Sequence, residues 1–315
     1  MKKCYINTIA AIHPNGTIND DGMLHAIEPD YKSIITNANQ RRRMSHLVKM
    51  GVACGLDCIS QNPTAYIGAI ITATGLGCLA DTEKFLNIIS DNNEQLLNPT
   101  AFIQSTFNTI GAQIALICKN HSYNNTYVHR GLSFESALID SLMWVWRYNS
   151  NVLVGAADEV TDSSHIILKR LGLLNNVTLG EGAQFFILGN EKQDDTYAEL
   201  KAVKTFAKTF TNDELIIKIT DFLQENSLNN NDIDYLVTGK NGHKKQDIIY
   251  NDVENLFSSA SYSTFKDICG EYQTASSFAL WKAAKTMKEN PDIQNLLIYN
   301  HYNSINHSLI LLKKC

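Results

Sequence analysis

Three residues with reactive or charged side chains lie close together in one segment: Lys266, Cys269 and Glu271. A cysteine becomes a nucleophile when a neighbouring base or positive charge favours its thiolate, so a pair of Cys269 and Glu271 is one candidate for covalent chemistry. No histidine is positioned nearby in the sequence to activate the thiol, and the alternative is a small buried cysteine. A buried carboxylate is costly unless it is paired, so we also predict a structural salt bridge between Glu271 and Lys266.

A second candidate nucleophile is Ser133, which opens a predicted helix directly after a predicted strand at Thr126. A serine in the first turn of a helix commonly caps the free backbone N–H groups there, and capping is the alternative to catalysis. His129 precedes this strand-to-helix turn and could face a pocket; the alternative is a packed or interface residue. His243 lies in the polar segment 241–245, where we expect it to be solvated.

The cysteines give no pattern of metal binding. Cys54 and Cys58 are four residues apart and could share a helix face, but no paired histidine lies near them, so we expect no zinc or other metal site. Several cysteines have small or apolar neighbours, which is typical of buried reduced thiols in a cytosolic protein. The cysteines are Cys4, Cys54, Cys58, Cys78, Cys118, Cys269 and Cys315.

Composition and charge exclude several classes of protein. The chain has 315 residues, of which 44% are hydrophobic and 19% charged, as in an ordinary globular protein. Its formal net charge of −5 provides no basic field for nucleic acid or anionic lipid. No apolar run is long enough to predict a membrane span, and residues 1–5 look like the start of a strand rather than a signal peptide. We therefore expect a cytoplasmic protein.

Predicted strands and helices alternate along the chain, which indicates an α/β fold. The polar segment Asn190–Thr196 interrupts this pattern and predicts a boundary between two halves, residues 1–190 and 191–315. The predicted strands are Tyr5–Ile12, Tyr66–Thr74, the stretch at Thr126, Val152–Glu159, Ala183–Leu188, Ala198–Ala207, Ile233–Thr238, Leu296–Tyr299 and Ser308–Leu312. The predicted helices are Arg41–Ile59, Thr82–Ile89, Ile110–Lys119, the one following Gly131, Asn212–Glu225, Ile248–Phe257 and Thr274–Met287.

Four motifs across nearly the whole chain, taken in order, resemble those of the β-ketoacyl synthases, which have the thiolase-like fold. They are Arg42-Arg43-Met44-Ser45, Gly75-Leu76-Gly77, Val152–Glu159 and Gly180-Glu181-Gly182-Ala183. The resemblance implies two similar halves, each with a five-stranded sheet, stacked in five layers as α-β-α-β-α. It also implies buried helices that begin near Gly131 and Thr274.

The resemblance also places the catalytic residues of the family. An active ketosynthase needs a cysteine nucleophile and two histidines that stabilise developing charge. The nucleophile position falls on Gly131, the first histidine on Gly239 or Thr238, and the second histidine on Glu271, with Lys266 retained. Asp247 matches a carboxylate that the family keeps, and His301–Asn306 replaces its glycine-rich C-terminal loop. These departures predict a synthase-like scaffold without condensing chemistry.

The stretches Thr126–Ala137 and Cys269–Trp281 resemble most closely the short ketosynthases of aryl-polyene and flexirubin-type pigment clusters. Some of these look like chain-length factors, the inactive partners of a working synthase. We therefore predict a chain-length factor without cofactors that pairs with an active ketosynthase and an acyl carrier protein. The alternatives are an active condensing enzyme with a rearranged site, or a non-catalytic homodimer that binds a carrier protein or another partner. The basic run Arg41–Arg43 could touch an acidic carrier, or it is a solvated helix start.

In the thiolase fold, the helix before the nucleophile strand packs across the dimer axis towards the neighbour's acyl tunnel. Here that helix opens with Phe107, Asn108 and Ile110, which we predict as pocket or interface residues. A bulky side chain at the end of a tunnel would stop a growing chain by steric exclusion. The alternative is that Phe107 and Ile110 are ordinary core residues.

Overall fold

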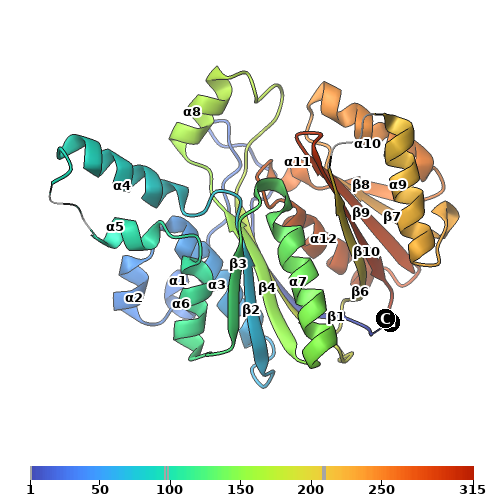
Figure 1. Cartoon of the computed structure of the whole chain (residues 1–315), viewed down its shortest axis with the longest axis horizontal. Helices are drawn as coiled ribbons and strands as arrows, with labels where there is room; N and C mark the ends of the chain where they lie inside the picture. Colours follow the sequence, from blue (N-terminus) through green and yellow to red (C-terminus); the bar gives the residue numbers. More distant parts are fainter. Residues whose placement is uncertain (1, 96, 98, 208–210) are drawn as a thin grey trace.

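The computed structural model describes residues 2–95, 97, 99–207 and 211–315. Its strands form one ten-stranded sheet in the order β3-β2-β4-β5-β1-β6-β10-β9-β7-β8 (Figure 1). The strands are β1 (Tyr5–Ile12), β2 (Ile67–Ala73), β3 (Tyr123–Tyr127), β4 (Asn151–Asp158), β5 (Gly182–Gly189), β6 (Ala198–Phe206), β7 (Tyr235–Thr238), β8 (Ser261–Thr264), β9 (Asn295–Tyr302) and β10 (Asn306–Lys313).

The sheet consists of two five-stranded parts with the same internal arrangement. In the first part β3, β2 and β4 are parallel, and β5 and β1 follow antiparallel. In the second part β8, β7 and β9 are parallel, and β10 and β6 follow antiparallel. The two parts of the sheet join where Tyr5 and Ile6 of β1 pair with Glu199 and Ala198 of β6. The predicted similar halves are thus confirmed, while their division at residues 190 and 191 stays a prediction.

Helices cover both faces of each five-stranded part and produce the five predicted layers (Figure 1). Helices α7 (Ser133–Tyr148) and α12 (Ser276–Glu289) form the central layer and share one apolar core with both halves. Helices α3 (His46–Ser60) and α6 (Thr109–Cys118) cover the outer face of the first half. Helices α9 (Asn212–Glu225) and α10 (Lys244–Leu256) cover that of the second. Strands buried on both faces explain the continuous apolar runs in the sequence.

Helices α4 (Leu79–Asp91) and α5 (Pro99–Gln104) project from the body as an arm (Figure 1). Only Asp81 of α4 is buried, so this helix contributes little to the core. The remaining helices are α1 (Tyr31–Ile34), α2 (Ala38–Arg43), α8 (Asp162–Arg170) and α11 (Lys266–Cys269). None of the helices in the described residues is both long and apolar enough to cross a bilayer.

Several predicted boundaries were wrong for local reasons. The single helix predicted at Arg41–Ile59 is two helices, because Ser45, at the N-cap position of α3, is extended (ψ 178°). Helix α4 begins after Cys78 rather than at a cap of Asp81 or Thr82. Helix α10 begins earlier than predicted because the side chain of His243 accepts a hydrogen bond from the N–H of Gln246 and caps it.

Candidate functional site

The position expected for the nucleophile is closed by packing. Strand β3 leads through a short 3-10 turn at Arg130–Leu132 into α7, and Gly131 is buried in this turn. A Cβ atom on Gly131 would lie 2.3 Å from the Cβ and Cγ atoms of Tyr302. That separation is far inside van der Waals contact, so Tyr302, at the end of β9, occupies the space that any side chain at this position requires.

The position expected for the first histidine is closed in the same way. A Cβ atom on Gly239 would lie 2.3 Å from Oδ1 of Asn300 and 2.6 Å from the hydroxyl of Tyr250. Tyr250 donates to Asn300 Oδ1 at 3.1 Å and accepts the N–H of His301 at 3.0 Å, so it is fixed in place. The preceding Thr238 is buried and donates to Glu254 at 3.0 Å.

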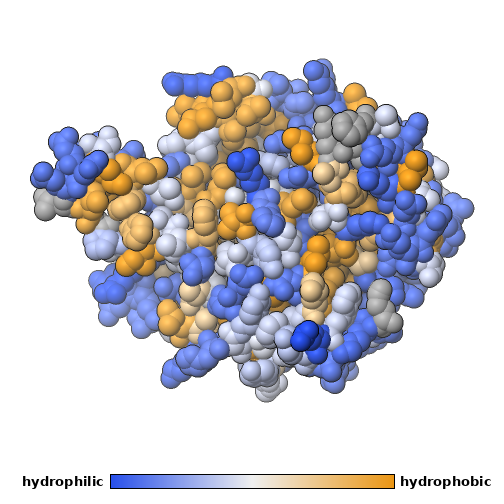
Figure 2. Space-filling view, viewed as in Figure 1, coloured by the Kyte–Doolittle hydropathy of each residue, from blue (hydrophilic) through white to orange (hydrophobic). Residues whose placement is uncertain are grey.

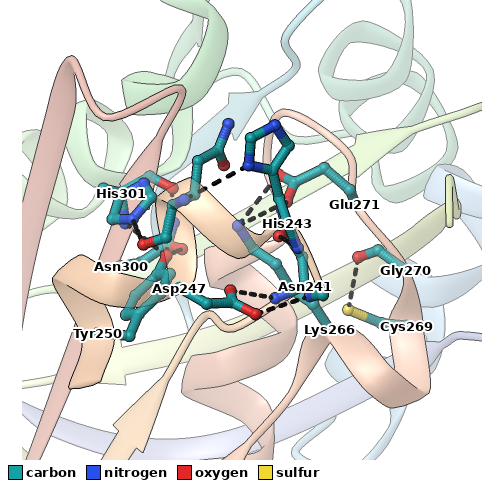
Figure 3. A network of polar contacts seen from close by, with 12 residues as sticks. Asn241, His243, Asp247, Tyr250, Lys266, Cys269, Gly270, Glu271, Asn300 and His301 are labelled. Carbon is teal, nitrogen blue, oxygen red and sulfur yellow. Dashed lines mark hydrogen bonds and ion pairs between the residues drawn. The ribbon is translucent and has the colours of Figure 1, made fainter. Parts of the chain in front are cut away.

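The position expected for the second histidine carries a paired carboxylate (Figure 3). Lys266 Nζ lies 2.8 Å from Glu271 Oε2 and 3.0 Å from Oε1, which confirms the predicted ion pair. Asn241 Nδ2 donates to the same carboxylate at 2.7 Å. The Lys266 side chain is only 2% exposed and that of Glu271 14%. The pair therefore satisfies two charges that would be costly if buried alone.

The loop after β7 aims Asn241 at Glu271 (Figure 3). Asp247 accepts the backbone N–H groups of Asn241 at 3.2 Å and Gly242 at 3.1 Å, which fixes the loop. His243 was expected to be solvated, but it is half-buried because it caps α10.

The loop that replaces the family's glycine-rich segment is a tight hairpin between β9 and β10. Asn303 and Ser304 both have φ of 54°, as in the two-residue turns that suit twisted hairpins. His301 stacks on Tyr250 with ring centroids 4.3 Å apart. Burial, together with the charge of Lys266, lowers the pKa of His301 to about 3. His301 is therefore a neutral packed residue at physiological pH rather than a general base.

A cleft of ≈ 290 Å³ is lined in part by Glu271 and Tyr302. Its polar side is built around Glu271, and its apolar side is built by α8 and the segment that follows it. The polar lining residues include Glu159, Ser164, Asn175, Asn241, His243, Gln246, Glu271, Gln273 and Asn303, and the apolar ones include Leu168, Leu173, Leu174, Val177, Leu179 and Tyr302. The lining thus offers both polar and apolar contacts, and within the described residues it contains no cysteine.

The other two candidate nucleophiles, Ser133 and Cys269, are buried and make hydrogen bonds to nearby backbone groups. Ser133 is fully buried; its hydroxyl donates to the Arg130 carbonyl at 2.8 Å and accepts the His129 N–H at 2.7 Å. It therefore stabilises the turn before α7, but it does not cap that helix, whose N-cap residue is Leu132. Cys269 is also fully buried, and burial raises the pKa of its thiol well above the ordinary value. Its sulfur points to the Gly270 carbonyl, 3.3 Å away (Figure 3).

Of the predicted interface residues, Phe107 and His129 are exposed on the surface, whereas Ile110 lies in the core. Phe107 is 51% exposed, and both Phe107 and Asn108 precede α6 and line an open groove beside β3. Ile110 is buried against Gly51 and belongs to the core, which is the alternative interpretation. His129 is exposed and its Nδ1 lies 3.0 Å from the Ser136 hydroxyl.

Tyr302, Tyr250 and Asn300 were not identified from the sequence, although they decide the character of the site. The available signal was the bulky Tyr302 in a loop that is glycine-rich in the resembled family. Within the described residues, no group of three or more His, Cys, Asp or Glu side chains is placed to hold a metal ion. Cys54 and Cys58 are both buried in α3.

Two similar halves in five layers, with strand-to-helix turns at Gly131 and near Thr274, define a protein of the thiolase-like class. The family model described as "Beta-ketoacyl synthase, N-terminal domain" matches residues 25–218. The chain therefore belongs to the β-ketoacyl synthase family.

Solved structures give the same fold at low sequence identity. A type II polyketide ketosynthase, in complex with its acyl carrier protein and bound to the hexaketide, is 12% identical, with a TM-score of 0.82 over 100% of both chains. The ishigamide ketosynthase/chain length factor is 13% identical, with a TM-score of 0.82 over 99% of both chains. A β-ketoacyl synthase from Burkholderia phymatum STM815 is 13% identical, with a TM-score of 0.80 over 100% of both chains. No curated protein matches by sequence.

Proposed function

We propose that this chain is a non-condensing subunit that pairs with an active ketosynthase and acts as its chain-length factor. The observation that carries the proposal is the occupied nucleophile position, where Tyr302 leaves no room for a side chain at Gly131. A ketosynthase-type fold without the acyl-carrying cysteine would contribute to condensation through a catalytic partner. The similar structures include a ketosynthase/chain length factor, which supports this role by analogy of fold.

The surface beside β3 supports a partner of similar fold. Strand β3 is an edge of the sheet, and an unpaired edge is a ready template for another strand. Phe107 is exposed beside this edge, and the projecting arm exposes Leu86, Phe102 and Ile103. Figure 2 shows apolar surface along this arm and over α8. Exposed apolar side chains that gather beside a free sheet edge favour a protein interface.

The product class and the carrier are finer parts of the same proposal. The resemblance of Thr126–Ala137 and Cys269–Trp281 favours aryl-polyene or flexirubin-type chains, assembled in the cytoplasm on an acyl carrier protein. The two alternatives are a condensing enzyme with a rearranged site and a non-catalytic homodimer that binds a carrier or another partner.

Intact-mass spectrometry separates the first alternative from the proposal. After incubation of the isolated chain with acyl-carrier and malonyl-carrier substrates, we expect no acyl adduct and no decarboxylation. An adduct on Ser133 or Cys269 would establish the condensing-enzyme alternative.

Co-purification separates the homodimer from the proposal. We expect the chain to form a stable complex with an intact ketosynthase encoded beside it, and Phe107→Asp to weaken that complex at least tenfold. Ile217→Asp is the matched control, because Ile217 is 58% exposed on α9, which covers the outer face of the second half. A chain that forms only homodimers in the presence of the ketosynthase would contradict the proposal.

A further inference from the structure

Residues 13–28 form an irregular strap that leaves β1 and crosses the loop before β5. The N–H of Leu24 donates to the Leu179 carbonyl at 2.9 Å, and the N–H of Ile27 donates to the His13 carbonyl at 3.1 Å. Met23 and Leu24 of the strap are buried, and a backbone bridge from Leu24 to Gly180 pairs it with the loop. Side-chain contacts must therefore contribute much of what holds the strap in place.

The side chains that make these contacts form a continuous network of alternating positive and negative charges. His25 Nε2 lies 2.7 Å from Asp21 Oδ2, and its Nδ1 lies 3.3 Å from Glu181 Oε1. His46 Nε2 lies 3.3 Å from Glu181 Oε2, and its Nδ1 lies 2.9 Å from Glu28 Oε1. The side chain of Glu181 is only 2% exposed and also accepts the Ala26 N–H at 3.2 Å. The network links residues 21–28 of the strap to α3 through the buried carboxylate of Glu181.

The geometry of this network requires the imidazole rings of both His25 and His46 to be protonated. Each imidazole places both of its nitrogens against a carboxylate oxygen. A neutral imidazole has one N–H donor, whereas an imidazolium has two. Deprotonation of His25 or His46 would therefore leave one carboxylate facing a lone pair in place of a donor.

The loop under the strap is bonded directly to the cleft. Glu271 donates its N–H to the Thr178 carbonyl at 2.9 Å, and Gly180 donates its N–H to the Glu271 carbonyl at 3.2 Å. Leu24, Leu179 and Glu271 thus lie on three adjacent segments joined by backbone bridges. The segments approach closely at Gly180, where a Cβ atom would lie 1.9 Å from the Cys269 carbonyl oxygen. The strap is therefore connected by two backbone bridges to the segment that carries Glu271.

We propose that protonated His25 and His46 clip the strap of residues 13–28 onto Glu181, and that loss of these protons at alkaline pH releases it. Release loosens the backbone pairing at Glu271 and changes the base of the cleft. This pH-dependent clip goes beyond the proposed function and does not depend on it.

The direction of the pH dependence follows from the charges around the rings. The hydrogen bond to Glu181 raises the pKa of His46 to about 9, and burial opposes it. Burial disfavours the charged form of His25, but its bonds to Asp21 and Glu181 outweigh burial and raise its pKa. The other titratable or charged groups that face this region are Tyr31, Glu83, Lys84, Asp91, Glu159 and Asp162.

Glu159, whose pKa burial raises to about 7, is mostly charged above neutral pH and favours the charged form of His46 there. A histidine with a raised folded pKa stabilises the fold fully below its unfolded pKa of about 6.5. That contribution is lost as pH rises through the folded value, which is about 9 for His46. The clip is closed at neutral pH and opens on the alkaline side.

Hydrogen–deuterium exchange of the full chain tests the clip directly. Between pH 7 and 9.5, corrected for the intrinsic rate, we expect protection of residues 20–28 to fall about tenfold or more, since one unit of pKa shift is a factor of ten. Residues 268–274 should loosen over the same range, while β4 stays protected as the internal reference. Glu28→Gln removes one partner of His46 and should move the midpoint down by about one pH unit.

Two histidine variants, one in the network and one outside it, provide a further test and its control. His46→Gln should lose strap protection already at pH 7, whereas His121→Gln, at an exposed histidine, should behave as wild type. Unchanged strap protection between pH 7 and 9.5, or an unmoved midpoint in Glu28→Gln, overturns the clip. A strap that loosens while residues 268–274 stay protected overturns the link to Glu271.

Discussion

Gly131 and Glu271 lie below the same cleft, yet the chain replaces the expected catalytic residue differently at each. At Gly131 there is no side chain, and the ring of Tyr302 lies where one would begin. At Glu271 a charged side chain remains, balanced by Lys266 and bonded by Asn241. At residue 131 the packed side chain of Tyr302 fills the space that a side chain would need. At residue 271 the ion pair with Lys266 fixes the side chain that is present. A catalytic residue returned to the first position meets a steric barrier, whereas a change at the second upsets an electrostatic balance.

Gly131→Cys should have the largest effect on stability. The new side chain meets Tyr302, and overpacking a core of this kind costs about 3 kcal/mol. In a Tyr302→Gly background, which also removes the Cβ atom of residue 302, the same substitution should cost much less, because the two side chains share one space. Chemical denaturation of the two single variants and the double variant measures this coupling. Additive costs would show that Tyr302 does not close the position.

Glu271→Ala should have a similar or slightly smaller effect for an electrostatic reason. It leaves the buried ammonium of Lys266 without its carboxylate, which costs about 3 kcal/mol. Glu271→Gln should be milder, since the amide oxygen still accepts a hydrogen bond from Lys266. Glu225→Ala is the control, because its pair with Lys204 is exposed and is worth less than about 1 kcal/mol. Equal melting of Glu271→Ala and wild type would contradict the structural role.

Ser133→Ala should lower stability by about 1 kcal/mol, because it removes two hydrogen bonds in the turn beside Gly131. Thermal unfolding measures the loss. Ser141→Ala, further along α7, is the comparison, since its hydroxyl donates to the Ala137 carbonyl within the same helix. If acyl transfer by a complex with the ketosynthase falls in Ser133→Ala without a loss of stability, Ser133 has a chemical role after all.

Phe107→Ala should have the smallest effect on the stability of the subunit, because its side chain is half exposed. In a complex with the ketosynthase it should leave assembly intact and lengthen the product, which mass spectrometry of released chains would detect. Ile110→Val is the control, because Ile110 lies in the core. An assembled Phe107→Ala complex with unchanged products would remove Phe107 from the proposed role.

The layers of the fold and the ion pair at Glu271 could be predicted from the sequence, whereas the contact that closes the position of Gly131 could not. Lys266 and Glu271 are close in sequence within one motif, so their pairing could be expected. The contact of Tyr302 with Gly131 joins distant segments, and only the packing of β9 against the turn before α7 reveals it. A glycine in a sequence indicates a missing side chain but does not identify the atoms that fill its space.

Local boundaries failed where tertiary contacts or caps override periodicity. The hydrophobic pattern runs through Met44 without a break, although Ser45 is extended and starts a new helix. Helix α8 was not predicted because Ile166 and Ile167 are exposed, so no buried face distinguishes it. The polar environment of His243 suggested solvent, whereas its ring caps α10.

The position of β1 has a consequence for synthesis on the ribosome. Among the described strands this one is made first, yet its main partner is β5, and Tyr5 pairs with Gly189 at the far end of the first half. During translation β1 must wait for nearly the whole first half to emerge, and the entropy of closing so long a loop slows its pairing. Its few bonds to β6 form later still. The nascent chain therefore carries an apolar strand without its neighbour for most of its synthesis, which is the interval in which a chaperone has the most to protect.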